Sequence, residues 1–306
     1  MAVLTPTVPS RGRWLGAARP RTWPAAIVPV LVAGAAAYRA GAFDWLPFVL
    51  TLVGALSIQV AANFANDASD ARRGADPADR EGPPRMVASG LISGPAMWVA
   101  CWTAIAIAAL CGVLLAMRVG PVILLIGAVS VLALLTYVGG PIPYGYRGLG
   151  ELFVLAFFGV LATGGSRLAY DGTCPAWVWL MGIPVGMLAA AILVANNLRD
   201  REIDARVNKN TLAVLVGEKR TRLLYGALMW GAMMFTAVAA AVGAAPELVV
   251  AGVGAAGLIP PLTRISGVAM TPNMYAPLLG GTARLHLVYG ILLSVGIVLD
   301  RVLRGL

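Results

Sequence analysis

The feature that most constrains this chain is a series of long stretches without a single charged residue. A helix that crosses a bilayer needs about 20 mostly apolar residues, and about 17 suffice. Only 12% of the 306 residues are charged and 59% are hydrophobic, whereas about a quarter of a typical soluble domain is charged. The sequence therefore excludes a soluble enzyme, a disordered chain and a disulfide scaffold, and predicts a polytopic membrane protein. The charge-free stretches are 22–38, 45–66, 86–117, 119–146, 152–166, 172–198, 223–246, 248–263, 265–283 and 285–299.

These stretches predict an all-α fold of nine transmembrane helices. The stretch 265–283 is rich in Gly, Pro and polar residues, so we interpret it mainly as a loop before the last helix. The whole chain, 1–306, is predicted to form one transmembrane domain. The predicted helices are 22–39, 46–66, 94–117, 120–140, 150–169, 175–197, 222–243, 246–263 and 277–299.

The distribution of basic residues predicts the orientation in the membrane. Of the 23 Lys and Arg residues, 18 lie in the N-terminal segment or on the side of the loops after predicted helices 2, 4, 6 and 8. Because cytoplasmic loops carry an excess of Lys and Arg, the N-terminus and the loops 67–93 and 198–221 are expected in the cytoplasm and the C-terminus outside. No basic segment precedes an apolar core at the N-terminus, so we expect a multi-pass protein of the cell (inner) membrane without a cleaved signal peptide.

The net charge of +9 follows from this distribution. Basic residues at the membrane surface also bind anionic lipid headgroups, so lipid is an expected partner and nucleic acid is not. The sequence has one histidine, His286, and three cysteines without C-x-x-C spacing. Zinc sites and a Ser-His-Asp triad are therefore excluded. The sequence leaves the oligomeric state open.

Nine of the fourteen acidic residues fall in the two predicted cytoplasmic loops. In the first, Gln59, Asn63, Asp67 and Asp70 are spaced by 4, 4 and 3 residues, which places them on one face of a helix. Carboxylates one turn apart repel each other and destabilise a helix. The same carboxylate and amide oxygens are good ligands for a hard divalent cation.

The second cluster repeats this form at the end of the sixth predicted helix. Asn196, Asp200 and Asp204 are spaced by 4 and 4, with Asn197 beside the first. The element Asn-x-x-x-Asp thus occurs twice on the same predicted side, which is consistent with an internal duplication. Each cluster alone is also explained as a solvated helix end with paired acids and bases. Because amides inside apolar spans are costly unless they face a cavity or a partner, the two together indicate a shared metal site.

Mg²⁺ is the predicted metal, since it binds a few carboxylates together with phosphate oxygens of a substrate. Basic residues alternate with the acids in both loops, and Lys and Arg bind diphosphate. An apolar tail on that diphosphate would lie among the apolar helices, so a lipid diphosphate fits both parts. The basic residues are Arg72, Arg73, Arg80 and Arg85 in the first loop, and Arg199, Arg201, Arg206 and Lys209 in the second.

Several segments resemble the UbiA superfamily of intramembrane prenyltransferases. The first cluster resembles its N-x-x-N-D-x-x-D motif and the second its D-x-x-x-D motif. The order D-x-x-x-G-x-D from Asp70 and the PYGY-x-GLGE segment resemble the branch that prenylates a naphthoate. Asn208 departs from the Gly that this pattern usually has before the Lys, although Asn tolerates φ > 0 better than most residues. The resemblance is carried by 17–34, the segment NFANDASDARRGAD with REGPPR, and 139–159, 196–214 and 281–290.

The resemblance implies a helical bundle around a central cavity, capped by the two cytoplasmic loops. It also implies transfer of a polyprenyl group from polyprenyl diphosphate to 1,4-dihydroxy-2-naphthoate, with loss of diphosphate and CO₂, to give demethylmenaquinone. Two alternatives stay open: a UbiA-type enzyme with another aromatic acceptor, and a membrane transporter built from repeats. The transporter predicts acids near the middle of the bilayer.

Under this hypothesis each candidate residue has a role. Lys209, Arg72 and Arg199 neutralise the leaving diphosphate, and the faces of Tyr137 and Tyr144 shield an allylic cation. Arg147 and Arg85 are the candidates for the naphthoate carboxylate, and Glu151 for orienting an Arg or a substrate hydroxyl. Tyr137 as a core aromatic and Arg147 as a positive-inside anchor are the competing structural explanations. The expected Mg²⁺ ligands are Asn63, Asp67, Asp70, Asn196, Asp200 and Asp204, with Asn197 as an alternative to Asn196 and as a substrate-binding residue.

Overall fold

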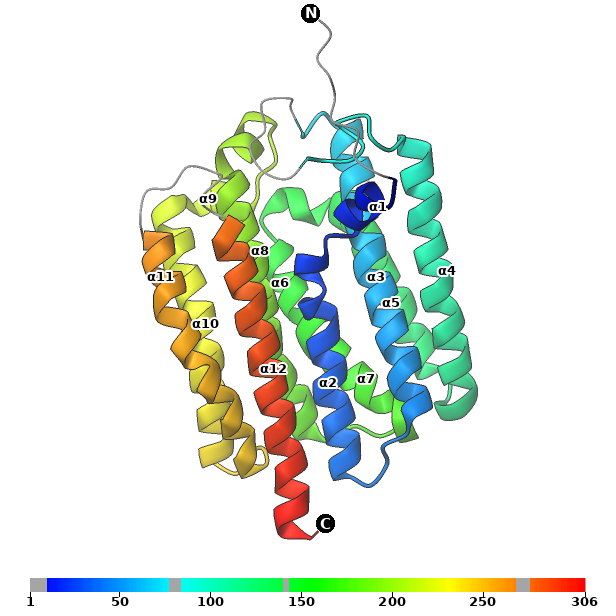
Figure 1. The fold of residues 1–306 in the computed structure, drawn as a ribbon, viewed down its shortest axis with the longest axis vertical. Coiled ribbons are helices and arrows are strands. Elements are labelled where there is room, and N and C mark those ends of the chain that lie inside the picture. The colour runs from blue at the N-terminus through cyan, green and yellow to red at the C-terminus, as the bar shows by residue number, and fades with distance from the viewer. Residues whose placement is uncertain (1–9, 77–83, 140–142, 268–275, 306) are drawn as a thin grey trace, which may run out of the picture.

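The computed structural model describes residues 10–76, 84–139, 143–267 and 276–305. All regular elements in these ranges are helices, which confirms the all-α fold class (Figure 1). The first half of the chain contains α1 (Ser10–Ala18), η1 (Pro20–Thr22), α2 (Pro24–Arg39), α3 (Trp45–Arg72), α4 (Gly94–Val119), α5 (Val122–Val138) and η2 (Tyr144–Arg147).

In the second half, several short elements join end to end into longer rods. The segments α6 (Gly150–Val154), η3 (Leu155–Leu161, a π-helix) and α7 (Ala162–Asp171) form one rod, and the 3₁₀-helix η4 (Glu247–Leu258) continues into α11 (Ile259–Gly267). The remaining helices are α8 (Ala176–Arg206), α9 (Leu212–Val216), α10 (Glu218–Ala241) and α12 (Ala276–Arg304).

Seven rods are long and apolar enough to cross a membrane, by length and composition. Each of the nine predicted segments coincides with a helical rod, but α2 and α5 have only 16 and 17 residues. Seven candidate spans are therefore found in the described part of the chain, and nine spans remain a prediction. The seven candidate spans are α3, α4, the α6–α7 rod, α8, α10, the η4–α11 rod and α12.

Two helices continue beyond the predicted membrane spans. These spans end at residues 66 and 197, whereas α3 continues to Arg72 and α8 to Arg206, which is consistent with the helical spacing of the aspartates that follow each span. Charge limits where a helix can cross the bilayer, whereas the helical hydrogen bonds continue until the backbone changes conformation. Just past the two helix ends, Gly74 and Asn208 have φ values of 67° and 57°, the left-handed conformation that commonly ends a helix. Of the expected first loop, residues 77–83 lie outside the described residues.

The two acidic helix ends lie at the same end of the bundle. Figure 1 shows α3 and α8 both ending at the top, whereas α12 ends at the bottom. We call the end that carries Asp67, Asp70, Asp200 and Asp204 the acidic end.

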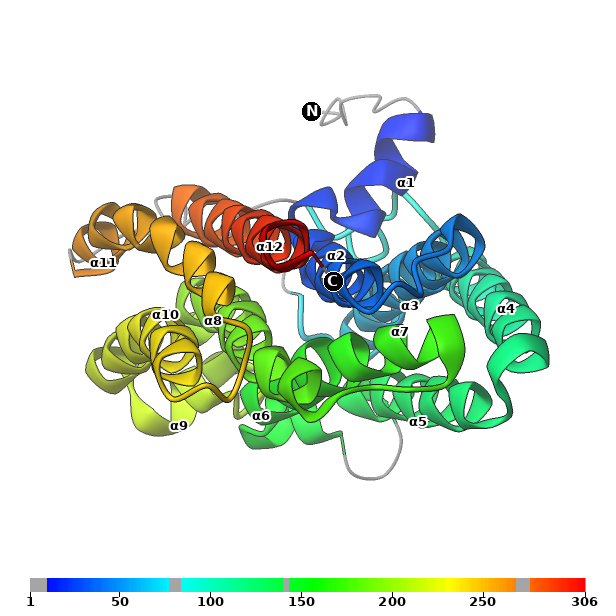
Figure 2. The same cartoon turned by 90° about the horizontal axis from the view of Figure 1, so that it is seen from below.

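The helices α3 and α8 differ in burial. In the apolar window of α8, 72% of the residues are buried, compared with 22% for α3. Seen from below, α8 lies inside the bundle, where it contacts η3, α10, α12 and α7 (Figure 2). Its apolar residues join those of α10, η4 and α12 in the main hydrophobic core.

Glycines permit a close contact between α8 and the π-helical segment. A Cβ on Gly159 would lie 2.3 Å from Cα of Gly186 and 2.4 Å from the carbonyl oxygen of Gly182. Since no real side chain tolerates such distances, the two backbones approach this closely only with glycine at the contact. This contact holds the α6–α7 rod against α8. Phe153 and Phe157 of this rod line the cavity described next.

Candidate active site

A cavity of about 560 Å³ lies among α2, α3, α4, α5, the α6–α7 rod and α8. This agrees with the expected helical bundle around a cavity. Most predicted site residues line it: Asn63, Asp67, Arg85, Tyr137, Tyr144, Asn196, Asn197, Arg199, Asp200, Asp204 and Lys209.

The carboxylates of α3 are held by groups from distant parts of the chain. Asp67 accepts hydrogen bonds from the backbone N–H groups of Met86 (3.2 Å) and Val87 (3.0 Å). Asp70 accepts one from the hydroxyl of Tyr146 (2.7 Å) and forms an ion pair with Nζ of Lys209 (3.0 Å). Both carboxylates are buried, with 2% and 1% exposure.

Lys209 joins the two acidic clusters. It follows α8, its backbone N–H donates to the carbonyl of Asp204 (2.8 Å), and its side chain reaches Asp70 on α3. Burial lowers the pKa of its ammonium, but the carboxylates of Asp70, Asp204 and Asp200 outweigh burial and raise it above the ordinary value. Lys209 is therefore a buried, positively charged group at the cavity.

Tyr146 completes this arrangement from η2. Burial raises the pKa of its phenol, and the neighbouring Asp70 carboxylate raises it further. The phenol therefore stays protonated and donates its hydrogen bond to Asp70. Its ring also lies under two cations, 5.2 Å from Nζ of Lys209 and 5.3 Å from the guanidinium of Arg73.

The carboxylates of α8 are held mainly by local partners. Arg199 donates two hydrogen bonds to Asp200, both 2.7 Å, and a third to the amide oxygen of Asn196 (2.7 Å). Asp204 accepts a hydrogen bond from Thr211 (3.4 Å). Arg199 and Asp200 are 8% and 4% exposed, so this ion pair is buried.

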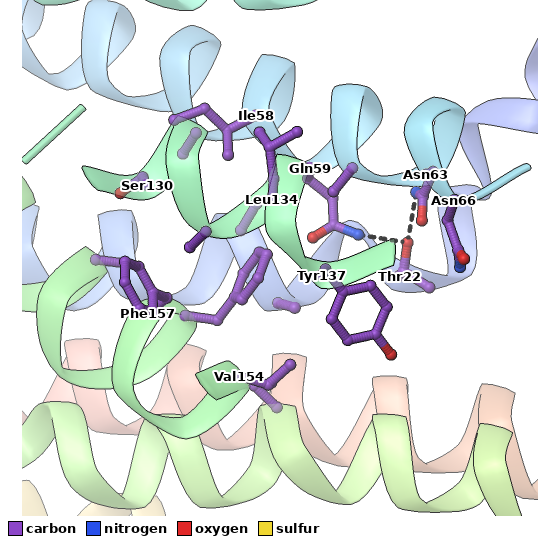
Figure 3. A pocket seen from close by; sticks show the side chains of 18 of the residues that line it. Thr22, Ile58, Gln59, Asn63, Asn66, Ser130, Leu134, Tyr137, Val154 and Phe157 are labelled. Atoms are coloured by element: carbon purple, nitrogen blue, oxygen red, sulfur yellow. Dashed lines mark hydrogen bonds between the residues drawn. The ribbon is translucent and has the colours of Figure 1, made fainter. Parts of the chain in front are cut away.

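The metal hypothesis can be tested on the donor atoms present. Within the described ranges, no group of three or more His, Cys, Asp and Glu side chains is arranged to hold a metal ion. Two amide oxygens nevertheless fit the hypothesis. The Oδ1 of Asn66 is buried and has no hydrogen-bond partner among the described residues, and Asn66 lines the cavity one residue before Asp67 (Figure 3). The Nδ2 of Asn63 donates to Ala18 and Thr22, which leaves its oxygen as the remaining acceptor. Oxygen donors of this kind suit Mg²⁺.

Aromatic rings form part of the cavity wall. The rings of Tyr137 and Tyr144 meet edge to face at 5.3 Å, and Tyr144 stacks on Phe153 at 3.9 Å. Phe157 continues this row, with its ring centroid 5.9 Å from that of Phe153. The wall therefore presents several aromatic faces beside the acidic end.

Four predicted residues do not line the cavity. Arg72 and Arg147 are exposed, because the last turn of α3 and the end of η2 direct them outward. Glu151 is buried and accepts a hydrogen bond from Asn197 (2.9 Å), so it fixes that amide. Asp70 is not among the lining residues, but it is paired with Lys209, which is.

Other residues of the site were missed by sequence reasoning, and of those named here all but Tyr146 line the cavity. Asn66 is the second Asn of the N-x-x-N-D motif, so the signal was present but we chose Asn63 alone. Tyr146 is adjacent to the predicted Arg147, and only its contacts with Asp70 and Lys209 distinguish it. Arg19 and Arg21 line the cavity from the N-terminal segment, whose basic residues we had assigned only to orientation.

Comparisons with known proteins agree with this arrangement. The chain is 41% identical over 230 residues to a 1,4-dihydroxy-2-naphthoate octaprenyltransferase of Mycobacterium tuberculosis, covering 75% of this chain and 78% of the relative. It is 38% identical to the Escherichia coli protein of the same name, covering 74% and 75%. A UbiA homologue from Archaeoglobus fulgidus, solved bound to DMAPP and Mg²⁺, has the same fold, with a TM-score of 0.61, 17% identity and coverage of 92% and 99%.

The family assignment covers nearly the whole described fold. The model of the UbiA prenyltransferase family matches residues 26–297, from α2 into α12. That range includes both acidic clusters, Lys209 and the aromatic wall. The chain therefore belongs to the UbiA prenyltransferase family.

Proposed function

We propose that the protein is a Mg²⁺-dependent prenyltransferase that joins the polyprenyl group of polyprenyl diphosphate to 1,4-dihydroxy-2-naphthoate. Diphosphate and CO₂ are lost, and the product is the prenylated quinol, the reduced form of demethylmenaquinone. The observation that carries this proposal is the meeting of two acidic helix ends and the buried Lys209 at one end of an aromatic-walled cavity. The names of the two relatives support the naphthoate acceptor, and the ligands of the archaeal homologue support prenyl diphosphate with Mg²⁺.

The proposed setting is the cell (inner) membrane, with residues 1–306 as one domain. The acidic end and the N-terminus face the cytoplasm, and the C-terminus lies outside. The excess of Lys and Arg on the side of the acidic end supports this orientation.

The residues proposed to hold Mg²⁺ are drawn from both helices. They are Asn63, Asp67 and Asp70 on α3 and Asn196, Asp200 and Asp204 on α8, with Asn66 added because its buried oxygen lacks a partner. A bound Mg²⁺ supplies positive charge that stabilises diphosphate as a leaving group. Asp200 is paired with Arg199, and Asp70 with Lys209, so metal binding would free both cations for the diphosphate.

The other steps of the proposed reaction are assigned to individual side chains. Lys209 and Arg199 bind diphosphate oxygens, and the C–O bond to the prenyl group breaks with its electron pair going to diphosphate. Tyr137 and Tyr144 stabilise the allylic cation through their ring faces, while the enclosed cavity excludes water. The naphthoate carbon that bears the carboxylate forms the new C–C bond, and loss of CO₂ returns the electron pair to the ring.

The carboxylate of the acceptor needs a cationic partner. Of our two candidates, Arg147 is exposed and outside the cavity lining, whereas Arg85 lines the cavity and contacts Asp76 at 3.1 Å. Arg85 is therefore the proposed partner, with Arg19 and Arg21 as further cations of the lining.

An acceptor panel tests the proposal. The purified protein is supplied with polyprenyl diphosphate, Mg²⁺ and either 1,4-dihydroxy-2-naphthoate or 4-hydroxybenzoate, and products are identified by mass. We expect a prenylated, decarboxylated naphthoate product, no benzoate product, and no product of either kind after removal of Mg²⁺ with EDTA. Prenylation of the benzoate alone would show another acceptor class, and turnover unaffected by EDTA would exclude the metal.

The transporter alternative is not favoured. It predicts acids near the middle of the bilayer, whereas the four aspartates lie near the ends of α3 and α8 (Figure 1). The same assay separates the classes, because a transporter releases no diphosphate from a prenyl donor.

A further inference from the structure

One segment of the cavity wall has a role in the proposed mechanism only through its two arginines. The segment Arg19–Thr22, just before α2, lies against α3 and lines the cavity. Arg19 has φ 49° and ψ 70°, a left-handed conformation that is uncommon for a residue other than glycine. Such a conformation is often found at functional sites, where surrounding contacts maintain it.

Thr22 connects this segment to α3. Its hydroxyl donates a hydrogen bond to the carbonyl of Arg19 (2.9 Å) and accepts two, from Nε2 of Gln59 (2.9 Å) and from Nδ2 of Asn63 (3.1 Å). Figure 3 shows the two amides converging on Thr22. A hydroxyl has one proton and two lone pairs, so all its hydrogen-bonding capacity is used.

These hydrogen bonds determine which atoms of the Gln59 and Asn63 amides remain available to other groups. Because the Thr22 proton is directed to Arg19, both amides must offer N–H groups to Thr22 and turn their carbonyl oxygens away. The second Nδ2 proton of Asn63 goes to the carbonyl of Ala18 (2.9 Å). The carbonyl oxygens of Gln59 and Asn63 are therefore left as hydrogen-bond acceptors.

Gln59 is the more informative of the two. It lines the cavity at 6% exposure, four residues before Asn63, which is about 6 Å further along the helix from the acidic end. Ile58, Leu134 and Phe157 surround this part of the cavity (Figure 3). Over the described ranges, no group donates a hydrogen bond to its Oε1. This oxygen is not one of the fully buried side-chain atoms without a partner, and Gln59 lines the cavity. Its Oε1 is therefore an acceptor that a ligand with a hydrogen-bond donor can use.

The chemistry of the two proposed substrates identifies that ligand. Diphosphate oxygens accept hydrogen bonds, and the prenyl chain has no polar hydrogen. Only the aromatic acceptor carries hydroxyl donors. Moreover, Gln59 lies just inside the proposed diphosphate site, where the reactive carbon of the prenyl group and the attacking ring must meet.

We infer that Gln59 is a specificity residue for the aromatic acceptor, with its Oε1 accepting a hydrogen bond from an acceptor hydroxyl. Thr22 is a positioning residue, because it orients the Gln59 amide. This inference rests on the proposed function and adds to it the residue that recognises a hydroxyl group of the aromatic acceptor.

The first test separates the two substrates. We expect Gln59→Leu to raise KM for 1,4-dihydroxy-2-naphthoate about five- to tenfold, the effect of one neutral hydrogen bond, with KM for polyprenyl diphosphate unchanged. Thr22→Val is expected to have a smaller effect of the same kind, and Thr22→Ser none. Ser130→Ala is the matched control, since Ser130 lines the same cavity but bonds within its own helix, to Ile126.

The second test uses inhibitors, so that a folding defect cannot imitate the result. The inhibition constants of 1-hydroxy-2-naphthoate, 4-hydroxy-2-naphthoate and 2-naphthoate are compared in the wild type and Gln59→Leu. We expect the variant to bind at least one hydroxylated analogue about five- to tenfold more weakly and 2-naphthoate equally well. An equal loss for all three, or no loss for any, would overturn the inference.

Failure of the proposed function would be seen in a different measurement, the assay of the wild-type protein. It appears as absence of a prenylated naphthoate from the wild-type protein, whereas failure of this inference appears only as unchanged acceptor discrimination in Gln59→Leu. If the wild type instead prenylates another phenolic acceptor, the same comparison is made between that acceptor and its deoxy analogue.

Discussion

The ends of α3 and α8 carry the same Asn-x-x-x-Asp element, but the structure holds their carboxylates in different ways. On α3, Asp67 and Asp70 are bound by groups from residues 86 and 87, from η2 and from the segment after α8. On α8, Asp200 is bound by its own neighbour, Arg199. Of the contacts between described residues, those of Asp67 and Asp70 therefore come from distant segments, and those of Asp200 come from an adjacent residue.

The apolar parts of the two helices differ in burial, but their acidic ends do not. The apolar window of α8 is 72% buried and that of α3 only 22%. Asp67 and Asp70 are nevertheless 2% and 1% exposed, compared with 4% and 5% for Asp200 and Asp204. Lys209 and Tyr146 therefore connect two helix ends whose carboxylates are both buried.

The largest expected effects come from the carboxylates themselves. We expect Asp67→Ala and Asp200→Ala each to reduce turnover by at least about 100-fold, as for loss of a main electrostatic group. Asp200→Ala is also expected to destabilise the fold by about 3–5 kcal/mol, since it leaves Arg199 buried without its partner. Asp67→Ala removes an acceptor from two N–H groups, at about 1–3 kcal/mol. Turnover and thermal unfolding in detergent measure the two effects separately.

A double variant distinguishes these effects further. Arg199→Leu combined with Asp200→Ala is expected to recover most of the lost stability without recovering turnover. Near-normal turnover in either single aspartate variant would contradict the metal assignment.

Loss of the connecting cation should have the next largest effect. We expect Lys209→Met to reduce turnover by about 100-fold, because it removes both the partner of Asp70 and a cation for the diphosphate. Lys209→Arg keeps the charge and is expected to retain more activity. Lys219→Met, at an exposed position near the start of α10, is the matched control and should behave as the wild type.

Tyr146→Phe tests the same connection more gently. The substitution removes the hydroxyl that donates to Asp70 but keeps the ring beside Lys209 and Arg73. A hydrogen bond to a charged group contributes about 1.5–3 kcal/mol, so we expect a lower unfolding temperature and about a tenfold loss of turnover. If Tyr146→Phe matches the wild type in both measurements, Lys209 alone connects the helix ends.

The smallest effect is expected at Asn208, which ends α8 with φ 57°. Asn208→Gly should change the free energy of unfolding by less than about 0.5 kcal/mol, because glycine adopts this conformation freely. Asn208→Ala should cost about 1 kcal/mol, since alanine adopts it with strain. Thermal unfolding of the two variants measures the difference, and equal stability would show that the backbone of this turn rearranges.

Part of the site could be read from the sequence because it depends on local spacing. Asn63, Asp67, Asn196, Asp200 and Asp204 line the cavity as their helical spacing predicted. Roles that depend on contacts between segments were less predictable. Arg147 and Glu151 belong to a recognisable segment, yet the first is exposed and the second binds Asn197.

The amino-acid sequence by itself determined that this is a membrane protein, that its fold is all-α, and on which helix faces its aspartates lie. These properties depend on apolar run length and on a helical period of 3.6 residues, which are local. Only the tertiary structure decided that Lys209 reaches Asp70, that Tyr146 supports this pair, and that Thr22 orients Gln59. The partners in each of these contacts are separated by 139, 76 and 37 residues, so their meeting depends on how the helices pack.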